Sequence, residues 1–344
     1  MKTTVKLFFV LSALAAQLLL PAQSEVNRAQ LALFGQLPEV MESASNPLTE
    51  AKTDLGRMLY FDPRLSKNHD VSCNSCHGLD TYGQDNLPFS PGHKGQLGGR
   101  SSPPSYNAAG HISQFWDGRA ADVEEQAKGP VLNPVEMAMP SEEAVVAVLK
   151  SIPGYVDAFG AAFPGDADPV TYNNMAMAIG AFERKLVTPG RFDAYLAGDD
   201  SALTAEEQAG LETFLNTGCQ TCHMGPYVGG SLYQKLGLVK EWPDKSDLGR
   251  YEVTGNEFEK LFFKVPSLRN VAETGPYFHN GSIETLEEAV SVMAEYQLGR
   301  ELDEATVDSI VTFLKALTGD IPEAYVAKPE LPESSASTPK PDPT

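Results

Sequence analysis

The chain has 344 residues, with 26 Lys and Arg against 46 Asp and Glu, and a formal net charge of −20 at pH 7. Such an acidic surface disfavours binding to nucleic acid or to anionic lipid, and it favours fast, salt-sensitive encounters with a basic partner. The length predicts two domains in the mature chain.

The N-terminus is typical of a secretory signal peptide. Lys2 and Lys6 give it a basic start, an apolar run follows from Leu7 to Leu20, and small residues lead up to Ser24. The apolar run is short for a transmembrane helix, although an uncleaved anchor is the alternative interpretation. We therefore expect residues 1–24 to be removed near Ser24, export to the periplasm, and no integral membrane span in the mature protein.

All four cysteines fall in two C-x-x-C-H motifs, at residues 73–77 and 219–223. This pattern is the attachment motif of c-type haem, in which two thiols bond to the haem and the histidine ligates the iron. We therefore expect two covalent haem c groups, held by Cys73, Cys76, His77, Cys219, Cys222 and His223.

Other uses of four cysteines fit this pattern less well. A zinc site needs four ligands, whereas each motif offers three and has no fourth at the usual spacing. A disulfide framework is unexpected in a chain of this length with its cysteines in two tight pairs. A thioredoxin-like redox pair has no need of a histidine after both copies.

Helical signals dominate the chain. Residues 142–149 and 172–182 have helix-like apolar spacing, and a capping box at Thr204 predicts a helix that continues to Gly218. Two further helices are predicted over 285–293 and 303–317. Segments rich in glycine and proline, or in Pro, Ser and Thr, predict loops over 81–106 and 226–255 and a loosely ordered tail over 329–344.

We read the fold as mainly α, with two tandem cytochrome c-like domains that each carry one covalent haem c. The stretch Thr188-Pro189-Gly190 is the expected boundary. The predicted domains are an N-terminal haem domain over 25–188, a C-terminal haem domain over 189–325, and a tail over 326–344.

Each haem iron has a second axial position that needs a ligand. His93 lies in the glycine-rich loop, 93 − 77 = 16 residues after His77, and Met293 lies on a predicted helix. From the residues alone both assignments stay open, because a loop histidine is commonly a surface residue and a helical methionine commonly packs in a core.

The chain resembles the bacterial dihaem cytochrome c peroxidases over nearly its whole mature length. The stretches that carry the resemblance are LYFDPRLS (59–66), SCNSCH (72–77), QFWDGRA (114–120), EEQAKGP (124–130), NPVEM (133–137), VPSLRNV (265–271) and PYFH (276–279).

The resemblance implies different roles for the two haems. The haem on His77 would be the low-potential site at which hydrogen peroxide reacts, with His93 as a removable sixth ligand. The haem on His223, with Met293 opposite, would be the high-potential site that receives electrons, and His/Met ligation does raise a haem potential. Trp116 would lie between the two haems.

The resemblance also implies a catalytic pair and a calcium ion. Glu136 would be the distal carboxylate and Gln126 a neighbouring amide. Thr274 and Pro276 would offer backbone carbonyls to calcium between the domains. The family usually has a side-chain Asn ligand eight residues after the removable histidine; this chain has Ser101 there, a shorter and weaker ligand that puts the calcium affinity in question.

Some residues keep two interpretations. Trp116 could be a core residue and Glu136 an exposed carboxylate. His279 either bonds a haem propionate or braces its loop. His69 and His111 match no role in the family, and we read them as ordinary surface residues.

The expected function is reduction of hydrogen peroxide to water in the periplasm, with electrons from a small redox protein such as cytochrome c or a cupredoxin. The resemblance implies a homodimer. One alternative is a dihaem electron carrier without catalysis. Another is a relative that oxidises tryptophan residues of a partner protein to build a quinone cofactor, but those relatives have tyrosine where this chain has Met293.

Overall fold

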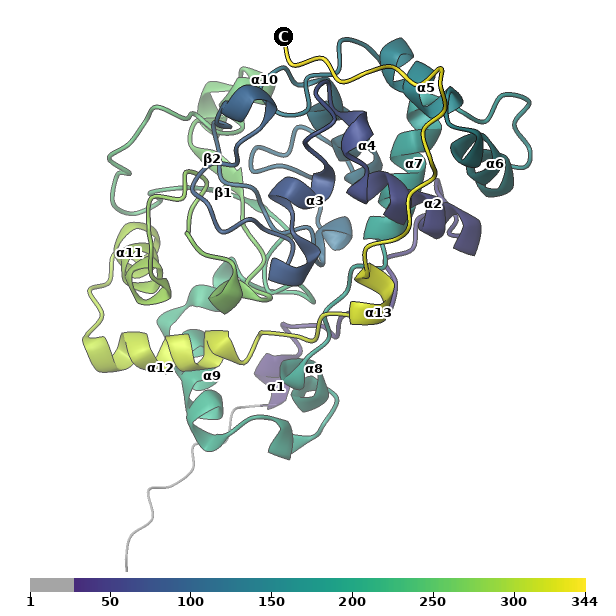
Figure 1. Ribbon diagram of the computed structural model, residues 1–344. Helices are drawn as coiled ribbons and strands as arrows, with labels where there is room; N and C mark the ends of the chain where they lie inside the picture. Colours follow the sequence, from purple (N-terminus) through teal and green to yellow (C-terminus); the bar gives the residue numbers. More distant parts are fainter. Residues whose placement is uncertain (1–27) are drawn as a thin grey trace, which may run out of the picture.

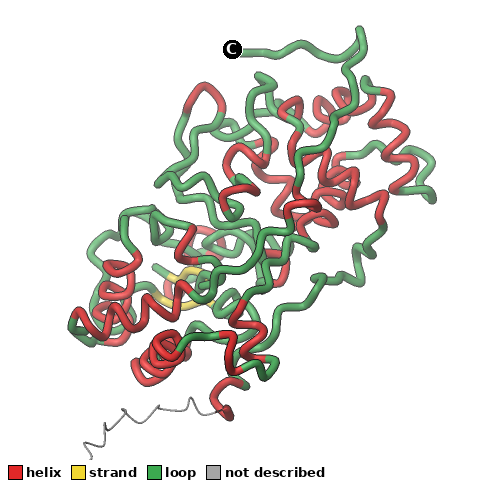
Figure 2. The backbone as a smooth tube through the Cα atoms, turned by 60° about the horizontal axis from the view of Figure 1, so that its bottom comes forward, coloured by secondary structure: helices red, strands yellow, loops and turns green. Residues whose placement is uncertain are grey.

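The computed structural model describes residues 28–344, so the expected signal peptide and its cleavage near Ser24 lie outside the described residues. Two groups of helices form two hydrophobic cores, one at the upper right and one at the lower left of Figure 1. Much of the remaining chain is loop (Figure 2). The prediction of a mainly α fold is confirmed.

The first core is built from α2 (Glu50–Phe61), α4 (Val123–Leu132), α5 (Glu142–Lys150), α6 (Pro153–Ala162) and α7 (Tyr172–Glu183). Helices α2 and α7 approach closely because Gly56 has no side chain: a Cβ there would lie 1.9 Å from the carbonyl oxygen of Ala178. Tyr60, Tyr155 and Phe182 are among the large side chains that fill this core.

The second core is built from α1 (Arg28–Leu31), α8 (Arg191–Leu196), α9 (Ala205–Thr217), α11 (Leu286–Leu298) and α12 (Glu304–Lys315). Here Gly210 allows α9 and α12 to pack closely, since a Cβ would lie 2.2 Å from the carbonyl oxygen of Ser309. The capping box at Thr204 begins α9 and the left-handed Gly218 ends it, as the sequence predicts.

The remaining helices and strands are short. They are α3 (Cys73–Cys76), α10 (Tyr251–Thr254), α13 (Glu323–Val326) and the antiparallel strands β1 (Tyr233–Lys235) and β2 (Phe262–Lys264). The loop predicted over 226–255 therefore contains β1 and α10. Each strand has only three residues, which is too few for an alternating pattern to be recognised in the sequence.

The expected domain boundary at Thr188 lies at a buried polar contact between the two halves. The Thr188 hydroxyl accepts hydrogen bonds from the side-chain amides of Asn107 and Asn270, both at 2.9 Å. The backbone amide of Gly319 donates to the Asn270 side chain at 2.9 Å. Each polar group here is satisfied within the protein, as burial requires.

Both ends of the chain depart from the predicted domain limits. Leu31 and Phe34, expected in the first domain, belong to the second core, where Phe34 packs edge-on against Phe192. Val326 belongs to the first core, and α13 lies beside the first group of helices in Figure 1. The limits 25–188 and 189–325 stay a prediction, and each outer end packs on the core of the opposite half.

The tail over 326–344 lacks regular structure after α13 but is bonded to the first group of helices, so it is better fixed than its composition predicts. Arg64 donates to the carbonyl of Pro332 at 2.8 Å, and the Asp342 amide donates to the carbonyl of Lys67 at 2.9 Å. Thr338 is buried and accepts from the Ser151 hydroxyl at 3.0 Å. Local composition does not report such distant partners.

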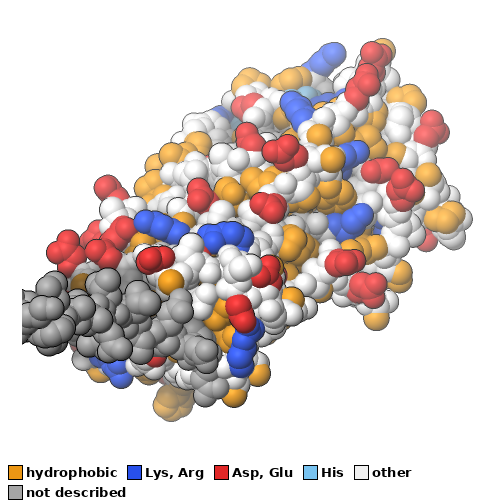
Figure 3. Space-filling model, turned by 90° about the horizontal axis from the view of Figure 1, so that it is seen from below, with side chains coloured by type: hydrophobic (Ala, Val, Ile, Leu, Met, Phe, Trp, Pro, Cys, Tyr) orange, Lys and Arg blue, Asp and Glu red, His pale blue; other side chains and the backbone are white. Residues whose placement is uncertain are grey.

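Charge is spread widely over the surface. Figure 3 shows acidic side chains distributed across the face seen from below, with basic residues among them. Within residues 28–344 no single helix is long and apolar enough to cross a membrane; the bent pair α5 and α6 meets that test only when taken together, by length and composition.

Candidate functional site

The first C-x-x-C-H motif makes a single helical turn. Ser72 caps α3, and the His77 amide donates to the carbonyl of Cys73 at 2.9 Å. The Tyr60 hydroxyl donates to the His77 carbonyl at 2.9 Å, which fixes the end of the turn. The turn places both thiols and the imidazole on one short piece of backbone, as covalent haem attachment requires.

The imidazole of His77 is in the protonation state that a metal ligand needs. Burial lowers the pKa of His77, so the ring is neutral, which is the form that binds a metal. Its buried Nδ1 atom has no hydrogen-bond partner among residues 28–344. The thiols of Cys73 and Cys76 are also held in their protonated form, because burial raises the pKa of Cys76 to about 11 and that of Cys73 further still.

The second motif begins with a 3₁₀ turn over Cys219–Thr221 but makes the equivalent backbone hydrogen bond. The His223 amide donates to the carbonyl of Cys219 at 3.0 Å. Burial lowers the pKa of His223 to about 4, and its Nδ1 lies 3.3 Å from the carbonyl of Val228. With Nδ1 donating to that carbonyl, Nε2 carries the free lone pair that an iron ligand needs.

A mainly apolar cavity opens beside the second motif. Met293 of α11 and His223 both line it, so the structure brings the two predicted axial ligands of the second haem together. The cavity wall also includes Cys219, Cys222 and Trp116. A flat, apolar prosthetic group attached to these cysteines fits this space, and one haem c is therefore compatible with the residues present.

His93 lies on a tight turn of the long loop. A short 3₁₀ turn spans His93–Gly95, and Lys94 has a φ of +58°. The side chain of His93 is 5% exposed, and its Nδ1 has no partner in the described part of the chain. His93 is therefore a buried imidazole with free hydrogen-bonding capacity, unlike the solvated histidine that loops usually carry.

The turn that bears His93 is packed directly on the segment that bears Glu136. The His93 amide donates to the Glu136 carbonyl at 2.7 Å. Gly92 is required for this approach, since a Cβ there would lie 2.1 Å from the carbonyl oxygen of Val135. Gln96 adds a hydrogen bond to the carbonyl of Pro134 at 3.2 Å.

The carboxylate of Glu136 lines a second cavity. The amide of Asn133 donates to its Oε1 atom at 2.8 Å. Burial raises the pKa of Glu136, while Arg119 and Asn133 oppose that shift. Arg119 in turn lies 3.5 Å above the ring of Phe115. This carboxylate is half-buried and oriented, unlike that of a fully exposed surface residue.

Gln126 is not among the residues that line the Glu136 cavity. It lies on α4, half-buried, while Glu125 and Gly129 of the same helix face the cavity. The polar groups that the structure brings to Glu136 are Asn133 and Arg119. Helical geometry explains the difference, because neighbouring positions on a helix point about 100° apart.

Trp116 connects the His93 loop to the second cavity. Its indole N–H donates to the carbonyl of Ser101 at 2.8 Å, and the Ser101 amide donates to the carbonyl of His279 at 2.8 Å. The ring lies edge-on to that of His279, with 6.4 Å between ring centroids. Trp116 is thus held between the loop that carries His93 and the cavity that His223 lines.

His279 is buried in the wall of the second cavity. Its ring stacks on Phe263 with 4.4 Å between centroids, and its Nε2 lies 3.8 Å from a carboxylate oxygen of Asp247. These contacts brace the loop, and the same ring also faces the cavity.

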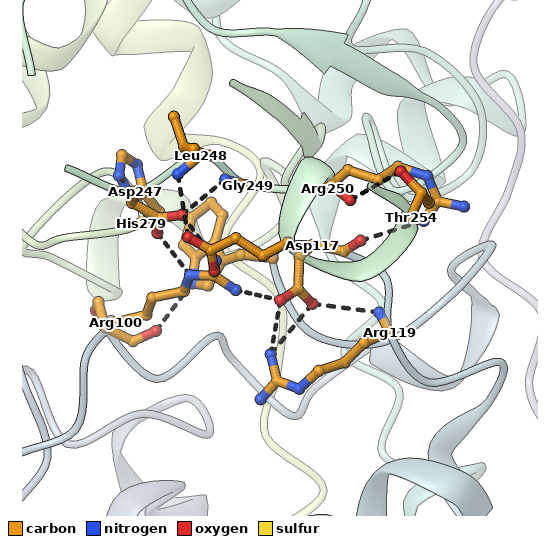
Figure 4. Close-up of polar contacts among 12 residues, drawn as sticks. Arg100, Asp117, Arg119, Asp247, Leu248, Gly249, Arg250, Thr254 and His279 are labelled. Atoms are coloured by element: carbon orange, nitrogen blue, oxygen red, sulfur yellow. Dashed lines mark hydrogen bonds and ion pairs between the residues drawn. The ribbon is translucent and has the colours of Figure 1, made fainter. Parts of the chain in front are cut away.

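A network of charged side chains ties the His93 loop to the C-terminal half (Figure 4). Arg100 binds Asp247 through two hydrogen bonds of 2.6 and 2.7 Å, and it also contacts Asp117 and Glu252. Asp117 additionally binds Arg119 at 3.0 Å. The network links residues that lie 247 − 100 = 147 positions apart. An arginine in a loop rich in glycine was the available signal, but its partners could not be read from the sequence.

The proposed calcium ligands Ser101, Thr274 and Pro276 line the cavity beside the second motif. Gln84 lies there too: its Nε2 is 3.4 Å from the Ser101 hydroxyl, and its buried Oε1 has no partner within the described chain. Among residues 28–344 no cluster of three or more His, Cys, Asp or Glu side chains is arranged to hold a metal. A cation here would depend on carbonyl, hydroxyl and amide oxygens.

His111 was read as a surface residue, and that interpretation is wrong. Its ring packs edge-on against Tyr227, and its Nδ1 lies 3.5 Å from the Nζ atom of Lys264. Burial and Lys264 together hold the pKa of His111 well below its usual value. His69 is half-buried, at a turn where its φ is +55°.

Residues 50–201 match the di-haem cytochrome c peroxidase family. The cytochrome c551 peroxidase of Pseudomonas aeruginosa is 48% identical over 317 residues, which cover 90% of each chain. The cytochrome c551 peroxidase of Nitrosomonas europaea is 47% identical over 302 residues, covering 87% of this chain and 89% of that protein.

More distant relatives share the fold. The methylamine utilization protein MauG of Methylorubrum extorquens is 33% identical over 318 residues, covering 88% of this chain and 87% of that protein. A solved MauG-like protein associated with microbial copper homeostasis is 26% identical with a TM-score of 0.76, covering 85% of this chain and 97% of that one. The chain therefore belongs to the di-haem cytochrome c peroxidase family, and it carries two haem groups.

Proposed function

We propose that this oxidoreductase reduces hydrogen peroxide to water at the haem on His77, with electrons that arrive at the haem on His223. One observation carries the proposal: a half-buried carboxylate, Glu136, is oriented by Asn133 and joined through its backbone to the turn of His93. A dihaem electron carrier has no use for such a carboxylate. The relatives named as cytochrome c peroxidases support the same reading.

A haem iron supplies the site at which one peroxide oxygen binds and the electrons that break the O–O bond. The chain must handle the protons. An ionised Glu136 can take the proton from the bound oxygen and return it to the leaving oxygen, which is general acid–base catalysis. Burial raises the pKa of Glu136, so its carboxylate is a stronger base than that of an ordinary glutamate. Asn133 holds the carboxylate in one orientation.

We propose that His93 controls access to the first iron. As a ligand of that iron, the His93 imidazole would exclude peroxide, and its withdrawal would free the site. The turn at Lys94 and Gly95, both with positive φ, is stabilised locally by the hydrogen bond from the Gly95 amide to the Gly92 carbonyl at 2.9 Å. The Arg100 network then provides a link through which the C-terminal half can act on this loop.

Several further features stay proposals. His223 and Met293 would hold the second iron, with Trp116 between the two haems. Calcium would bind near Ser101, Thr274 and Pro276, where Gln84 offers an additional buried oxygen. The electron donor would be a small redox protein with a basic face, a choice that the net charge of −20 supports. Export to the periplasm and a homodimer follow from the signal sequence and the resemblance.

The test is a stopped-flow assay of peroxide reduction by reduced cytochrome c, with and without reduction of one haem beforehand. Rapid, stoichiometric oxidation of the donor by peroxide supports the proposal. An electron carrier would exchange electrons with the donor but would not turn over peroxide. Oxidation of a tryptophan in a partner protein, without donor consumption, would favour the quinone-building alternative.

A further inference from the structure

Lys264 is a buried cation at the edge of the second cavity. It is the last residue of β2, pairs with Tyr233 of β1, and is 6% exposed. Its backbone amide donates to the Trp116 carbonyl at 2.8 Å, and its Nζ donates to the Ser113 carbonyl at 2.7 Å. The residue therefore sits where the hairpin meets the Trp116 loop, and it lines the same cavity as His223 and Met293.

Among residues 28–344, no carboxylate forms an ion pair with this ammonium group. No carboxylate of residues 28–344 lies within 4.0 Å of its Nζ atom. Asp117 is the acidic group that acts on it through space, but that carboxylate is already bound by Arg100 and Arg119. His111 is no substitute, because its pKa is held low and the ring is neutral.

Burying a charge without a nearby counter-ion costs folding free energy, so the presence of Lys264 here needs a reason. Burial lowers the pKa of Lys264 to about 7, even though the charge of Asp117 opposes the shift. The cavity wall around Lys264 is mainly apolar, with Phe263, Val265 and Leu236 near the hairpin. A haem brings two propionate carboxylates with it. A group bonded to Cys219 and Cys222 in this cavity has to place those carboxylates against polar partners.

We propose that the Nζ atom of Lys264 pairs with a propionate of the second haem, and that Lys264 thereby raises the potential of that haem. The proposal rests on the haem assignment of the proposed function, but not on peroxide chemistry. A positive charge in a low-dielectric wall favours the reduced iron, which carries one positive charge fewer. Without Lys264 the propionate would be uncompensated and would favour the oxidised iron.

The test compares three variants by redox titration of both haems. Lys264→Met removes the charge and keeps an apolar stem, and Lys264→Arg keeps the charge. Lys235→Met is the matched control, because it removes one charge from the exposed end of the paired strand. We expect Lys264→Met to shift the second haem's reduction equilibrium at least tenfold towards the oxidised form, about 59 mV for one electron. Lys264→Arg should recover most of the shift, and Lys235→Met should show none.

In the redox titration, either of two outcomes would overturn the proposal: a Lys264→Met midpoint equal to that of Lys235→Met, or a shift confined to the first haem. Resonance Raman spectra give a second readout that does not depend on the Met variant folding. In Lys264→Arg a guanidinium replaces the ammonium, so the propionate bending band should move relative to the wild type. An unmoved band in that variant would also overturn it. Both measurements need haem but no turnover, so failure of the peroxidase assay would leave them interpretable.

Discussion

The backbone amide of His93 donates a hydrogen bond to the carbonyl oxygen of Glu136, with 2.7 Å between nitrogen and oxygen. The proposed removable ligand and the proposed acid–base group are therefore attached to each other rather than only facing the same iron. Withdrawal of the His93 turn has to break this bond or carry the Glu136 segment with it. Access to the iron and placement of the carboxylate are coupled by this contact.

Glu136→Gln should lower peroxide turnover by about 10² or more, the usual scale for a lost general acid–base group. Both haem spectra should stay nearly unchanged. Glu125→Gln, in the same cavity wall but without the Asn133 hydrogen bond, is the control. Since proton removal needs the ionised form, the wild-type rate should fall as the pH drops through the raised pKa of Glu136, at a higher pH than for an ordinary glutamate. Wild-type turnover in Glu136→Gln would remove the role.

His93→Gly should leave the first haem five-coordinate or water-ligated in the oxidised protein. The turn bearing His93 is short and glycine-rich, so the ligand can be lost without repacking a helix. We expect a high-spin signal in the fully oxidised state and peroxide reduction without an activation lag. A low-spin oxidised variant that still needs prior reduction would mean that another residue is the ligand.

Met293→His should lower the midpoint potential of the second haem, because His/Met ligation gives a higher potential than ligation by two histidines. The first haem serves as the internal control, since Met293 lines only the cavity of the second motif among the two cavities described. Redox titration of both haems provides the measurement. Two unmoved midpoints would show that Met293 does not bind the iron.

Asp247→Asn should weaken the link between the His93 loop and the C-terminal half. The variant loses the charge that holds Arg100 through two hydrogen bonds, each worth about 2 kcal/mol when a charged group is involved. We expect a larger high-spin fraction at the first haem of the oxidised protein. Asp244→Asn, three residues earlier and exposed, is the control. Equal spin states in the two variants would exclude this network from the gate.

Glu183→Gln should flatten the dependence of stability on pH. Burial, reinforced by Glu124, raises the pKa of Glu183 from 4.5 to about 8. The folded protein then retains a proton that the unfolded chain releases, so the contribution to stability is present below pH 4.5 and is lost as the pH rises to about 8. The loss is on the order of 5 kcal/mol. Denaturant midpoints measured across this range check it; a slope equal to that of the wild type would contradict the prediction.

Local patterns predicted the parts of the structure that depend on neighbouring residues. The helical turns at Cys73 and Cys219, the cap at Thr204 and the left-handed Gly218 all form within a few positions of their signals. Met293 and His223 could be paired only through the family resemblance, because 293 − 223 = 70 residues separate them. Their shared cavity is consistent with that pairing.

The errors concern contacts between distant segments. His111 looked like a solvated histidine because nothing near it in the chain encloses it; Tyr227 and Lys264 do so from more than a hundred residues away. Lys264 carried a usable signal, since it is a single charge inside the apolar run FFKVP. The role of Gln126 comes from the resemblance alone and stays a prediction; on α4, Glu125 and Gly129 are the residues that line the cavity.

Each end of the chain packs on the core of the opposite half, and this exchange affects the cooperativity of unfolding. Leu31 and Phe34 complete the core around α9 and α12, while Val326 and the tail complete the core around α2 and α7. A cut at Thr188 would thus deprive each half of apolar surface that only the other fragment carries. We expect a single cooperative unfolding transition. Local unfolding of either terminus should destabilise the core that surrounds the haem pocket of the opposite half.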